Sequence, residues 1–270
     1  MKKTNAGFMK RILCLPVLAL LMISLLAGCS SGAKGYDYQF SDPAKGDTIA
    51  VIHTSMGDIT VRFFPEEAPK AVENFVTHAK EGYFDGMEWF RVMDYFIQSG
   101  DPTGSGDGGE SIWKEPFEDE IVDYLSPYCG ALCMANYGAF TGTNNSQFFI
   151  ITSKDTDISM AEAANELAPK DMQIAKEKLD NYARVGGAIW LDAQVGSLYE
   201  SNYSYKQTAH TVFGQVIDGM DVAIAISQVK TYTKTQENDA TIDNPNQTAI
   251  LENKPIEPVL INSIEIKTYE

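Results

Sequence analysis

The sequence predicts an all-β fold for the chain after residue 47, built as an antiparallel barrel. Its apolar and aromatic residues come in many short runs separated by Gly-rich turns, and helical periodicity is confined to a few stretches. Short strands at close intervals with few helices between them are typical of antiparallel barrels. After an initial hairpin, the expected strands lie in 89–98, 130–136, 147–152, 212–216 and 259–266.

Residues 48–64 are expected to form that first hairpin. Residue types alternate with period two along 49–53, and a second alternating run covers 59–64. The turn Ser55-Met56-Gly57-Asp58 separates the two runs. Alternation on both sides of a Gly-containing turn is typical of paired antiparallel strands.

An amphipathic helix is expected next, over 69–81. Pro69 suits the first helical position, apolar residues follow at 72, 75, 76 and 79, and Gly82 is a suitable stop. His78 falls beside Thr77 and off this apolar stripe, so it is expected to lie on the solvated surface.

Two later segments interrupt the succession of strands. The stretch 154–189 has apolar residues at 172, 175, 179 and 182, after Pro169 and before two glycines, and it predicts one inserted helix. The stretch 230–253 is rich in Thr, Asn and Asp and lacks an apolar face, so it predicts a long polar surface loop.

The first 28 residues have the composition of a secretory signal. Basic residues precede the uncharged run 12–27, which is short for a membrane span of about 20 residues. The run ends in Leu26-Ala27-Gly28-Cys29, which resembles a bacterial lipobox. This resemblance implies cleavage before Cys29 and attachment of a diacylglycerol to its thiol. An ordinary signal peptide with a chance Cys and an uncleaved anchor are the alternatives.

The expected organisation is therefore a signal peptide over 1–28, a lipidated Cys29 with a flexible tether over 29–46, and one domain over 47–270. Such a protein is expected outside the cytoplasm, anchored by lipid to the cell membrane. The lipid and the membrane are thus expected partners through Cys29.

The charge balance argues against nucleic acid as a partner. The chain has 21 Lys and Arg against 37 Asp and Glu. Because residues 1–28 hold four of the basic residues and none of the acidic ones, the remainder carries a net charge of −20. Such a surface repels polyphosphates and anionic lipid headgroups, which leaves the lipid as the expected anchor.

Two cysteines remain after the signal and the lipidated Cys29, namely Cys129 and Cys133. Residues four apart on a strand have Cα atoms roughly 13 Å apart, too far for a disulfide, so two buried free thiols are expected. His53, His78 and His210 show no metal-ligand spacing, and neither a metal nor another cofactor is expected.

Five short motifs carry a more specific signal. They are Phe90-Arg91-Val92 with Phe96-Ile97-Gln98-Ser99-Gly100-Asp101-Pro102, Phe117-Glu118-Asp119-Glu120, Met134-Ala135-Asn136, Ser146-Gln147-Phe148-Phe149-Ile150 and His210-Thr211-Val212-Phe213-Gly214. In this order they resemble the cyclophilin-type peptidyl-prolyl cis/trans isomerases, over about residues 48–266. The resemblance implies a closed eight-stranded antiparallel barrel capped by two helices, with the inserted helix as an addition. It also implies isomerase activity without a cofactor.

The resemblance assigns catalysis to Arg91, Gln98, Phe149 and His210. Rotation about an Xaa-Pro bond is opposed by amide resonance with a barrier of about 20 kcal/mol, and it requires neither a nucleophile nor a metal. When the bond twists, the prolyl nitrogen gains a lone pair, which the guanidinium of Arg91 can hydrogen-bond. Phe149 supplies the expected apolar pocket for the proline ring. His210 lines that pocket, and Gln98 fixes the neighbouring backbone.

Seven further residues are expected to bind substrate: Tyr95, Phe96, Ala135, Asn136, Gln147, Trp190 and Leu191. The expected substrates are proline-containing segments of exported polypeptides. Cyclosporin-type inhibitors are further candidate ligands, because the matching Trp matters for their binding in the family.

The hairpin that carries Arg91 departs from the family pattern. Arg91 and Gln98 are seven residues apart, one fewer than usual. The register therefore places either Tyr95 or Phe96 at the pocket, and both are candidates.

Two later segments depart from the pattern as well. The loop 137–145 is longer than usual, which predicts a reshaped rim beside the residues before the proline. Trp190-Leu191-Asp192 matches the family, but eighteen residues separate Leu191 from His210 where only a few are expected. This separation leaves the sensitivity to cyclosporin open.

Two alternative functions compete with the isomerase. A cyclophilin fold could hold proline-containing segments without accelerating them, as a binding module or chaperone. Arg91, Phe149 and His210 together argue against this, because a pure binder does not need the guanidinium. The run Gly104–Gly109 superficially resembles a phosphate-binding loop, but neither a Lys nor a helix follows it and an Asp lies within it.

Overall fold

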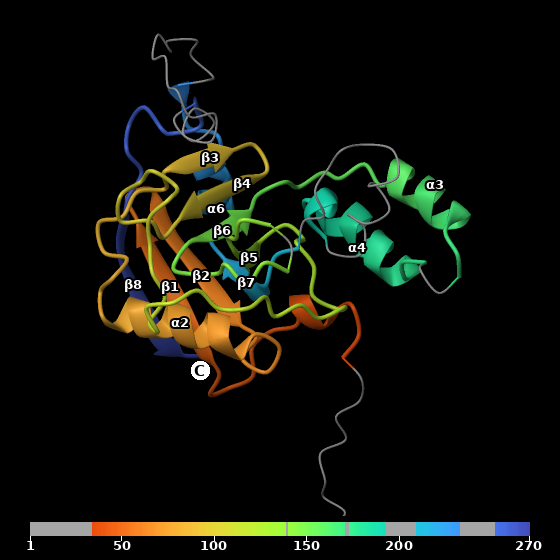
Figure 1. The fold of residues 1–270 in the computed structure, drawn as a ribbon, viewed down its shortest axis with the longest axis horizontal. Coiled ribbons are helices and arrows are strands. Elements are labelled where there is room, and N and C mark those ends of the chain that lie inside the picture. The colour runs from red at the N-terminus through yellow and green to blue at the C-terminus, as the bar shows by residue number, and fades with distance from the viewer. Residues whose placement is uncertain (1–33, 139, 171–172, 193–208, 233–251) are drawn as a thin grey trace, which may run out of the picture. The chain divides into compact units, whose positions relative to one another are not determined.

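The computed structural model describes residues 34–138, 140–170, 173–192, 209–232 and 252–270. Its main feature is one eight-stranded antiparallel sheet that curls around an apolar core (Figure 1). The strands are β1 (Thr48–Thr54), β2 (Gly57–Phe63), β3 (Arg91–Met93), β4 (Phe96–Ser99), β5 (Ala131–Met134), β6 (Phe148–Ile151), β7 (Val212–Asp218) and β8 (Ile261–Thr268). The helices are α2 (Pro69–Lys80), α3 (Ser159–Leu167), α4 (Lys176–Val185) and α6 (Met220–Ser227), with 3-10 turns η1 (Tyr38–Phe40) and η2 (Ile189–Leu191).

The two ends of the sheet approach each other without a continuous ladder. The strand order is β3-β4-β6-β5-β7-β2-β1-β8, so β3 and β8 are the end strands. Residues just before them are linked: the N–H of Trp89 donates to the carbonyl of Val259 at 2.9 Å, and that of Ile261 donates to Met87 at 2.8 Å. The expected strand number and antiparallel pairing are confirmed, but the sheet is a curled, open half-barrel. The outer edge of β3 meets the segment before β8 instead, where the N–H of Val92 donates to the carbonyl of Asn253 at 2.8 Å.

The predicted first hairpin is confirmed as β1 and β2. Its register pairs Ile52 with Ile59 and Ala50 with Val61, and all four side chains are fully buried. Alternate residues of the hairpin therefore face the core, as the period-two pattern predicts.

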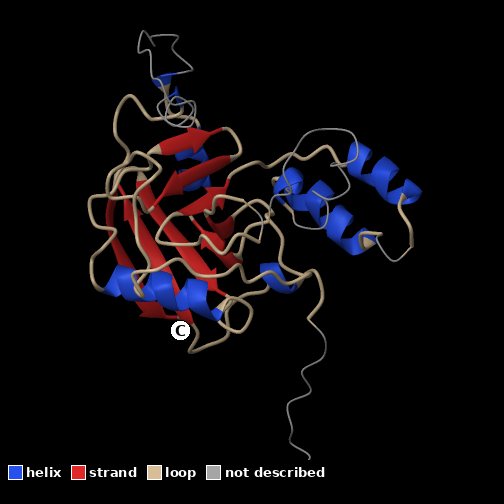
Figure 2. Cartoon of the chain, viewed as in Figure 1, coloured by secondary structure: helices blue, strands red, loops and turns tan. Residues whose placement is uncertain are grey.

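Helix α2 matches the predicted helix to within one residue and covers the core (Figure 2). Its Phe75 lies at the centre of an aromatic cluster, with the rings of Phe63, Phe84, Phe148 and Phe213 between 5.1 and 5.7 Å away. Aromatic pairs at these distances add to the stabilisation that burial gives. The second helix on this core is α6, which the strand pattern did not locate because its sequence is apolar almost throughout.

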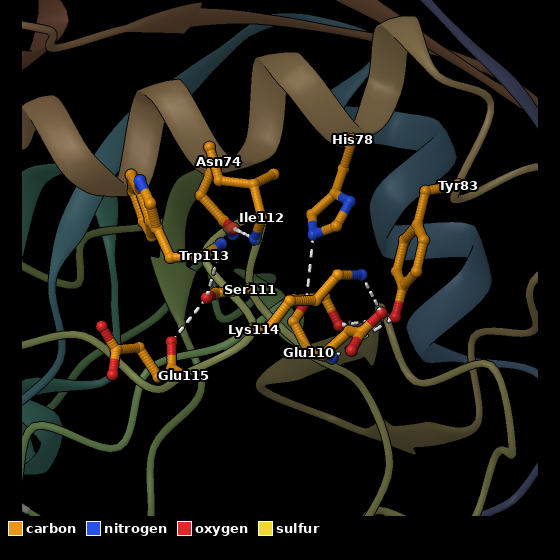
Figure 3. A network of polar contacts seen from close by, with 10 residues as sticks. Asn74, His78, Tyr83, Glu110, Ser111, Ile112, Trp113, Lys114 and Glu115 are labelled. Atoms are coloured by element: carbon orange, nitrogen blue, oxygen red, sulfur yellow. Dashed lines mark hydrogen bonds and ion pairs between the residues drawn. The ribbon is translucent and has the colours of Figure 1, made fainter.

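The expectation for His78 is wrong, because its side chain is only 3% exposed. Its Nε2–H donates to the carbonyl of Glu110 at 2.9 Å, and its ring stacks on Tyr83 at 4.0 Å (Figure 3). Burial lowers the pKa of His78, which favours the neutral ring. The segment 110–115 lies over this face of α2 and covers it. Helical periodicity reports on the helix alone and does not reveal a loop that folds over its polar side.

The inserted region contains two helices, α3 and α4, where one was expected. Pro169, taken as the start of a helix, lies in the connection between them. Leu179 and Tyr182 are buried on α4 as predicted, in a cluster with Tyr128 and Ile189. Met172 and most of the predicted polar loop 230–253 lie outside the described residues.

Part of the expected tether is folded. Gln39 of η1 is fully buried: its Nε2 donates to Gln215 Oε1 and to the carbonyl of Ser126, both at 2.9 Å, and its Oε1 accepts from the N–H of Ser126. The polar composition of this segment predicts a coil, and it does not reveal that the Gln39 amide pairs with groups far along the chain. The signal peptide and Cys29 lie outside the described residues. Within the described ranges, no helix has both the length and the apolar character needed to cross a membrane.

The two cysteines are free, as predicted. Cys133 is fully buried and Cys129 is partly buried. Burial raises the pKa of Cys129 to about 11 and also raises that of Cys133, so both thiols are protonated at neutral pH.

Asn74 fixes the segment 110–115 to α2, and its removal should destabilise the fold. Its Oδ1 accepts from the N–H of Ile112 and its Nδ2 donates to the carbonyl of Asn145, both at 2.9 Å. Asn74→Ala leaves both groups unpaired, and we expect a loss of about 2–4 kcal/mol in the free energy of unfolding. Urea denaturation of the variant and the parent chain measures this difference in the free energy of unfolding. Glu73→Ala, at the adjacent exposed position, is the control and should change stability by less than about 0.5 kcal/mol. Equal effects of the two variants would contradict the role of Asn74.

Candidate active site

Three of the predicted site residues lie in a row across neighbouring strands. The β3–β4 register places Arg91 opposite Gln98, and the β4–β6 register places Gln98 opposite Phe149. Directly opposed residues of antiparallel strands share a face of the sheet. The sheet therefore brings Arg91, Gln98 and Phe149 together.

The guanidinium of Arg91 is held in a defined position. Its Nη1 donates to Gln98 Oε1 at 3.3 Å, and its central carbon lies 4.9 Å from the centre of the Phe96 ring. Burial lowers the pKa of Arg91, but an Arg side chain, with an ordinary pKa above about 12, stays charged. Its Nε is buried and has no hydrogen-bond partner among the described residues. The guanidinium is thus a fixed cation at the edge of the site.

Two glutamines continue this contact into the neighbouring loop. Gln98 Nε2 donates to Gln147 Oε1 at 2.9 Å, and Gln147 Nε2 donates to the carbonyls of Gly106 and Gly108 at 3.0 and 2.7 Å. The backbone carbonyl of Gln147 accepts from Ala135 at 3.0 Å, which ties the rim of the site to the same residue. The side-chain amides of Gln98 and Gln147 are therefore oriented by their partners.

Asp101 shapes that glycine loop and was missed as a site residue, although it stands in the matched motif. Its Oδ2 accepts from the N–H groups of Gly106 and Gly108 at 2.6 and 3.1 Å, and its Oδ1 accepts from Thr103 at 2.7 Å. Burial opposes its ionisation, yet these hydrogen bonds hold the pKa of Asp101 below its ordinary value. Because the carboxylate occupies these N–H groups, the loop cannot cradle a phosphate with them.

The pocket is aromatic. Phe149 is 4% exposed and lies 5.5 Å from the Phe96 ring and 5.0 Å from the His210 ring, measured between ring centres. Of the two candidates in the short hairpin, Phe96 is the one that contacts Phe149. Tyr95 lies in the two-residue turn and packs on Trp190, 5.1 Å away. Both residues border the site, but in different places.

His210 is held neutral. Its Nδ1–H donates to the carbonyl of Met134 at 3.0 Å, so the other ring nitrogen, Nε2, carries a lone pair. Burial lowers the pKa of His210 to about 4, and the nearby charge of Arg91 acts in the same direction. The ring can therefore accept a hydrogen bond and does not act as an acid at neutral pH.

Asn136 supports the rim with its side chain. Its Nδ2 donates to Asp119 Oδ1 at 3.0 Å and to the carbonyl of Ala209 at 2.8 Å. Asp119 Oδ1 also accepts from Asn144, at the far end of the long loop. The side-chain amide of Asn136 is thus engaged within the protein.

Trp190 and Leu191 reach the site from η2. Leu191 packs against the cluster that contains Phe149, and Trp190 is 43% exposed beside Tyr95. Leu191 and His210 line the same cavity of about 250 Å³. The long separation between these two residues in the sequence has therefore not moved them apart in the fold.

The neutral state of His210 can be measured directly. We expect the imidazole to titrate near pH 4 in an NMR titration, with His210→Gln used to assign its resonances. An unfolded His titrates near about pH 6.5, so between about 6.5 and 4 the unfolded chain binds a proton that the folded chain does not. The free energy of unfolding should therefore decrease as the pH is lowered from about 6.5 to 4. His210→Gln should remove part of this decrease. A midpoint near 6.5 in the folded protein would contradict the assignment.

Comparisons with known proteins agree with this geometry. A family profile described as cyclophilin type peptidyl-prolyl cis-trans isomerase/CLD matches residues 49–247. A Staphylococcus saprophyticus protein named "Putative peptidyl-prolyl cis-trans isomerase" is 41% identical over 210 residues, which cover 76% of this chain and 95% of that protein. A Staphylococcus aureus protein of the same name is 39% identical over 225 residues, covering 83% and 93%.

Solved structures show the same fold. A crystal structure of a Cryptosporidium parvum cyclophilin type peptidyl-prolyl cis-trans isomerase matches with a TM-score of 0.52 and 24% identity, over 83% of this chain and 99% of that chain. A crystal structure of that protein in the presence of the dipeptide Ala-Pro matches with a TM-score of 0.50. With a profile match over most of its length and relatives near 40% identity, this chain belongs to the cyclophilin-type peptidyl-prolyl cis-trans isomerase family.

Proposed function

We propose that this isomerase acts on Xaa-Pro bonds of exported proteins while a lipid on Cys29 holds it at the outer face of the cell membrane. The observation that supports its catalytic part is the guanidinium of Arg91, which is held as a fixed cation beside the Phe149 pocket. A donor in this position can bond a lone pair that exists only in the twisted amide. Such an interaction lowers the barrier and not merely the energy of the bound substrate.

The aromatic pocket supplies the other half of the mechanism. Phe149, Phe96 and His210 surround the place where a proline ring fits, and their burial favours an apolar group there. With the ring held, the chain before the proline must turn. His210 Nε2 accepts a hydrogen bond from the substrate, and no proton is transferred in the reaction.

Arg91 acts as the electrostatic group. As the amide twists, its nitrogen becomes pyramidal and gains electron density, towards which the guanidinium donates. Gln98 and Gln147 keep the cation oriented through the hydrogen bonds that join them. Because the donors are in place before the bond rotates, the twisted state needs little further reorganisation.

A non-catalytic binding module is the alternative on the same fold. Burying a cation costs free energy through desolvation. A module that only binds proline would need the apolar pocket and not this cation. Cyclosporin-type inhibitors are proposed ligands of this pocket in either case. Their support is the position of Trp190 beside Tyr95 at the rim.

The role of Arg91 is tested with a soluble chain that starts at Ser31. Exchange NMR on an Ala-Pro peptide should show acceleration by this chain and a loss of about tenfold or more in Arg91→Ala, equivalent to at least about 1.4 kcal/mol of transition-state stabilisation. Arg184→Ala removes an exposed guanidinium on α4 and should leave the rate unchanged. Peptide binding without acceleration would favour the binding module.

The proposed location outside the cytoplasm is supported by two features of the sequence, the signal-like residues 1–28 and the lipobox-like residues 26–29. Exported chains fold outside the membrane, where prolyl isomerisation takes about 10–100 s and limits folding. A tethered isomerase would meet these chains as they emerge. The acidic surface would not bind anionic headgroups, so the lipid would be its attachment.

The anchor is tested by Cys29→Ser. In a bacterial host, we expect the parent chain to incorporate labelled palmitate and to enter the detergent phase on phase separation. Cys29→Ser should lose the label and leave the detergent phase. Retention of the variant in the detergent phase would favour an uncleaved anchor instead.

A further inference from the structure

A buried ion pair joins the inserted helix α4 to the turn that carries Trp190. Lys178 Nζ of α4 donates to Asp192 Oδ1 at 3.1 Å, and the side chains are 2% and 3% exposed. Tyr182, one helical turn along α4, donates its hydroxyl to Asp192 Oδ2 at 2.9 Å. Both carboxylate oxygens of Asp192 are therefore engaged by α4.

Asp192 directly follows η2, so this contact determines where η2 lies. The N–H of Asp192 donates to the carbonyl of Ile189 and closes the turn. Ile189 points into the cluster formed by Tyr182 and Leu179, whereas Leu191 packs towards the Phe149 cluster. The turn is thus shared between the inserted region and the pocket.

Part of the segment around η2 borders a cavity. The cavity of about 250 Å³ beside His210 is lined by Lys178, Leu191 and Asp192. A segment that borders such a space has few atoms to prevent it from moving into it. The polar contacts from α4 restrain Asp192 at this cavity.

Helix α4 is itself packed against the segment that leads into β5. Tyr182 lies 4.6 Å from the ring of Tyr128, whose hydroxyl donates to the carbonyl of Lys178. At the end of the insertion, Gly187 passes so close to the carbonyl of Pro127 that a Cβ would lie 2.6 Å from it. The position of η2 therefore depends, through α4, on the segment that leads into β5.

We propose that Lys178 and Tyr182 are positioning residues that hold Trp190 and Leu191 at the rim of the proline pocket by binding Asp192. The face of α4 that carries these two residues then supports the substrate-binding rim. This inference rests on the proposed function, because it assigns Trp190 and Leu191 to substrate binding. Lys178 and Tyr182, which set the position of Trp190 and Leu191, lie outside the sheet and outside the matched motifs.

The test uses the full chain in detergent with Lys178→Met and, separately, Tyr182→Phe. Tyr182→Phe removes only the hydroxyl and keeps the ring that packs on Tyr128. Lys176→Met is the matched control, because Lys176 forms an exposed pair with Asp180 on the same helix and does not contact η2. The measurements are the indole N–H resonance of Trp190, assigned with Trp190→Phe, and the separate values of KM and kcat for an Ala-Pro peptide.

In both variants we expect the Trp190 resonance to shift and KM to rise about threefold or more, with kcat changed less than KM. The control should leave all three unchanged. An unshifted resonance overturns the proposal, whether KM rises or not, because the effect then does not act through Trp190. If Lys178→Met does not fold, Tyr182→Phe decides. If the parent chain proves inactive, the proposed function fails, and the resonance together with the affinity for the peptide still tests the positioning.

Discussion

The site depends on one hydrogen-bonded row of side chains that crosses neighbouring strands. Arg91 donates to Gln98, Gln98 donates to Gln147, and Gln147 donates to the carbonyls of the glycine loop. Each member is oriented by the next, so the guanidinium has its direction before a substrate arrives. Preorganised donors stabilise developing electron density without the reorganisation that water would require. The carboxylate of Asp101 completes the row, because it holds the loop at the far end.

The same strands must serve both the core and the pocket, and the period of a strand makes this possible. On β6, Phe148 packs against Phe75 of α2 in the core, whereas its neighbour Phe149 faces the pocket. Successive side chains of a strand point to opposite faces, so both roles are met without a bend. All four residues of β6 are buried, so the strand is apolar throughout because one face lies in the core and the other in the pocket.

Local patterns in the sequence sufficed for the hairpin and α2, because these depend on neighbours along the chain. Contacts between distant segments could not be predicted in this way. His78 is buried by the segment 110–115, and Gln39 is buried by Ser126 and Gln215. The sequence predicts one helix in the inserted region because its regular apolar spacing begins at Met172. The shorter α3 buries one apolar side chain, Ala161, and has too weak a stripe to stand out.

The β3–β4 hairpin is one residue shorter than usual in the family between Arg91 and Gln98, yet these two residues still contact each other. Met93 and Phe96 close a two-residue turn, and Arg91 and Gln98 lie opposite each other farther from the tip. Opposed residues share a face whatever the length of the turn, so a deletion at the tip leaves their contact intact. What changes is the tip itself, where Phe96 enters the pocket and Tyr95 packs on Trp190. The shortened spacing therefore alters the wall of the Phe149 pocket, whereas the orientation of the guanidinium is set by the glutamines beside it.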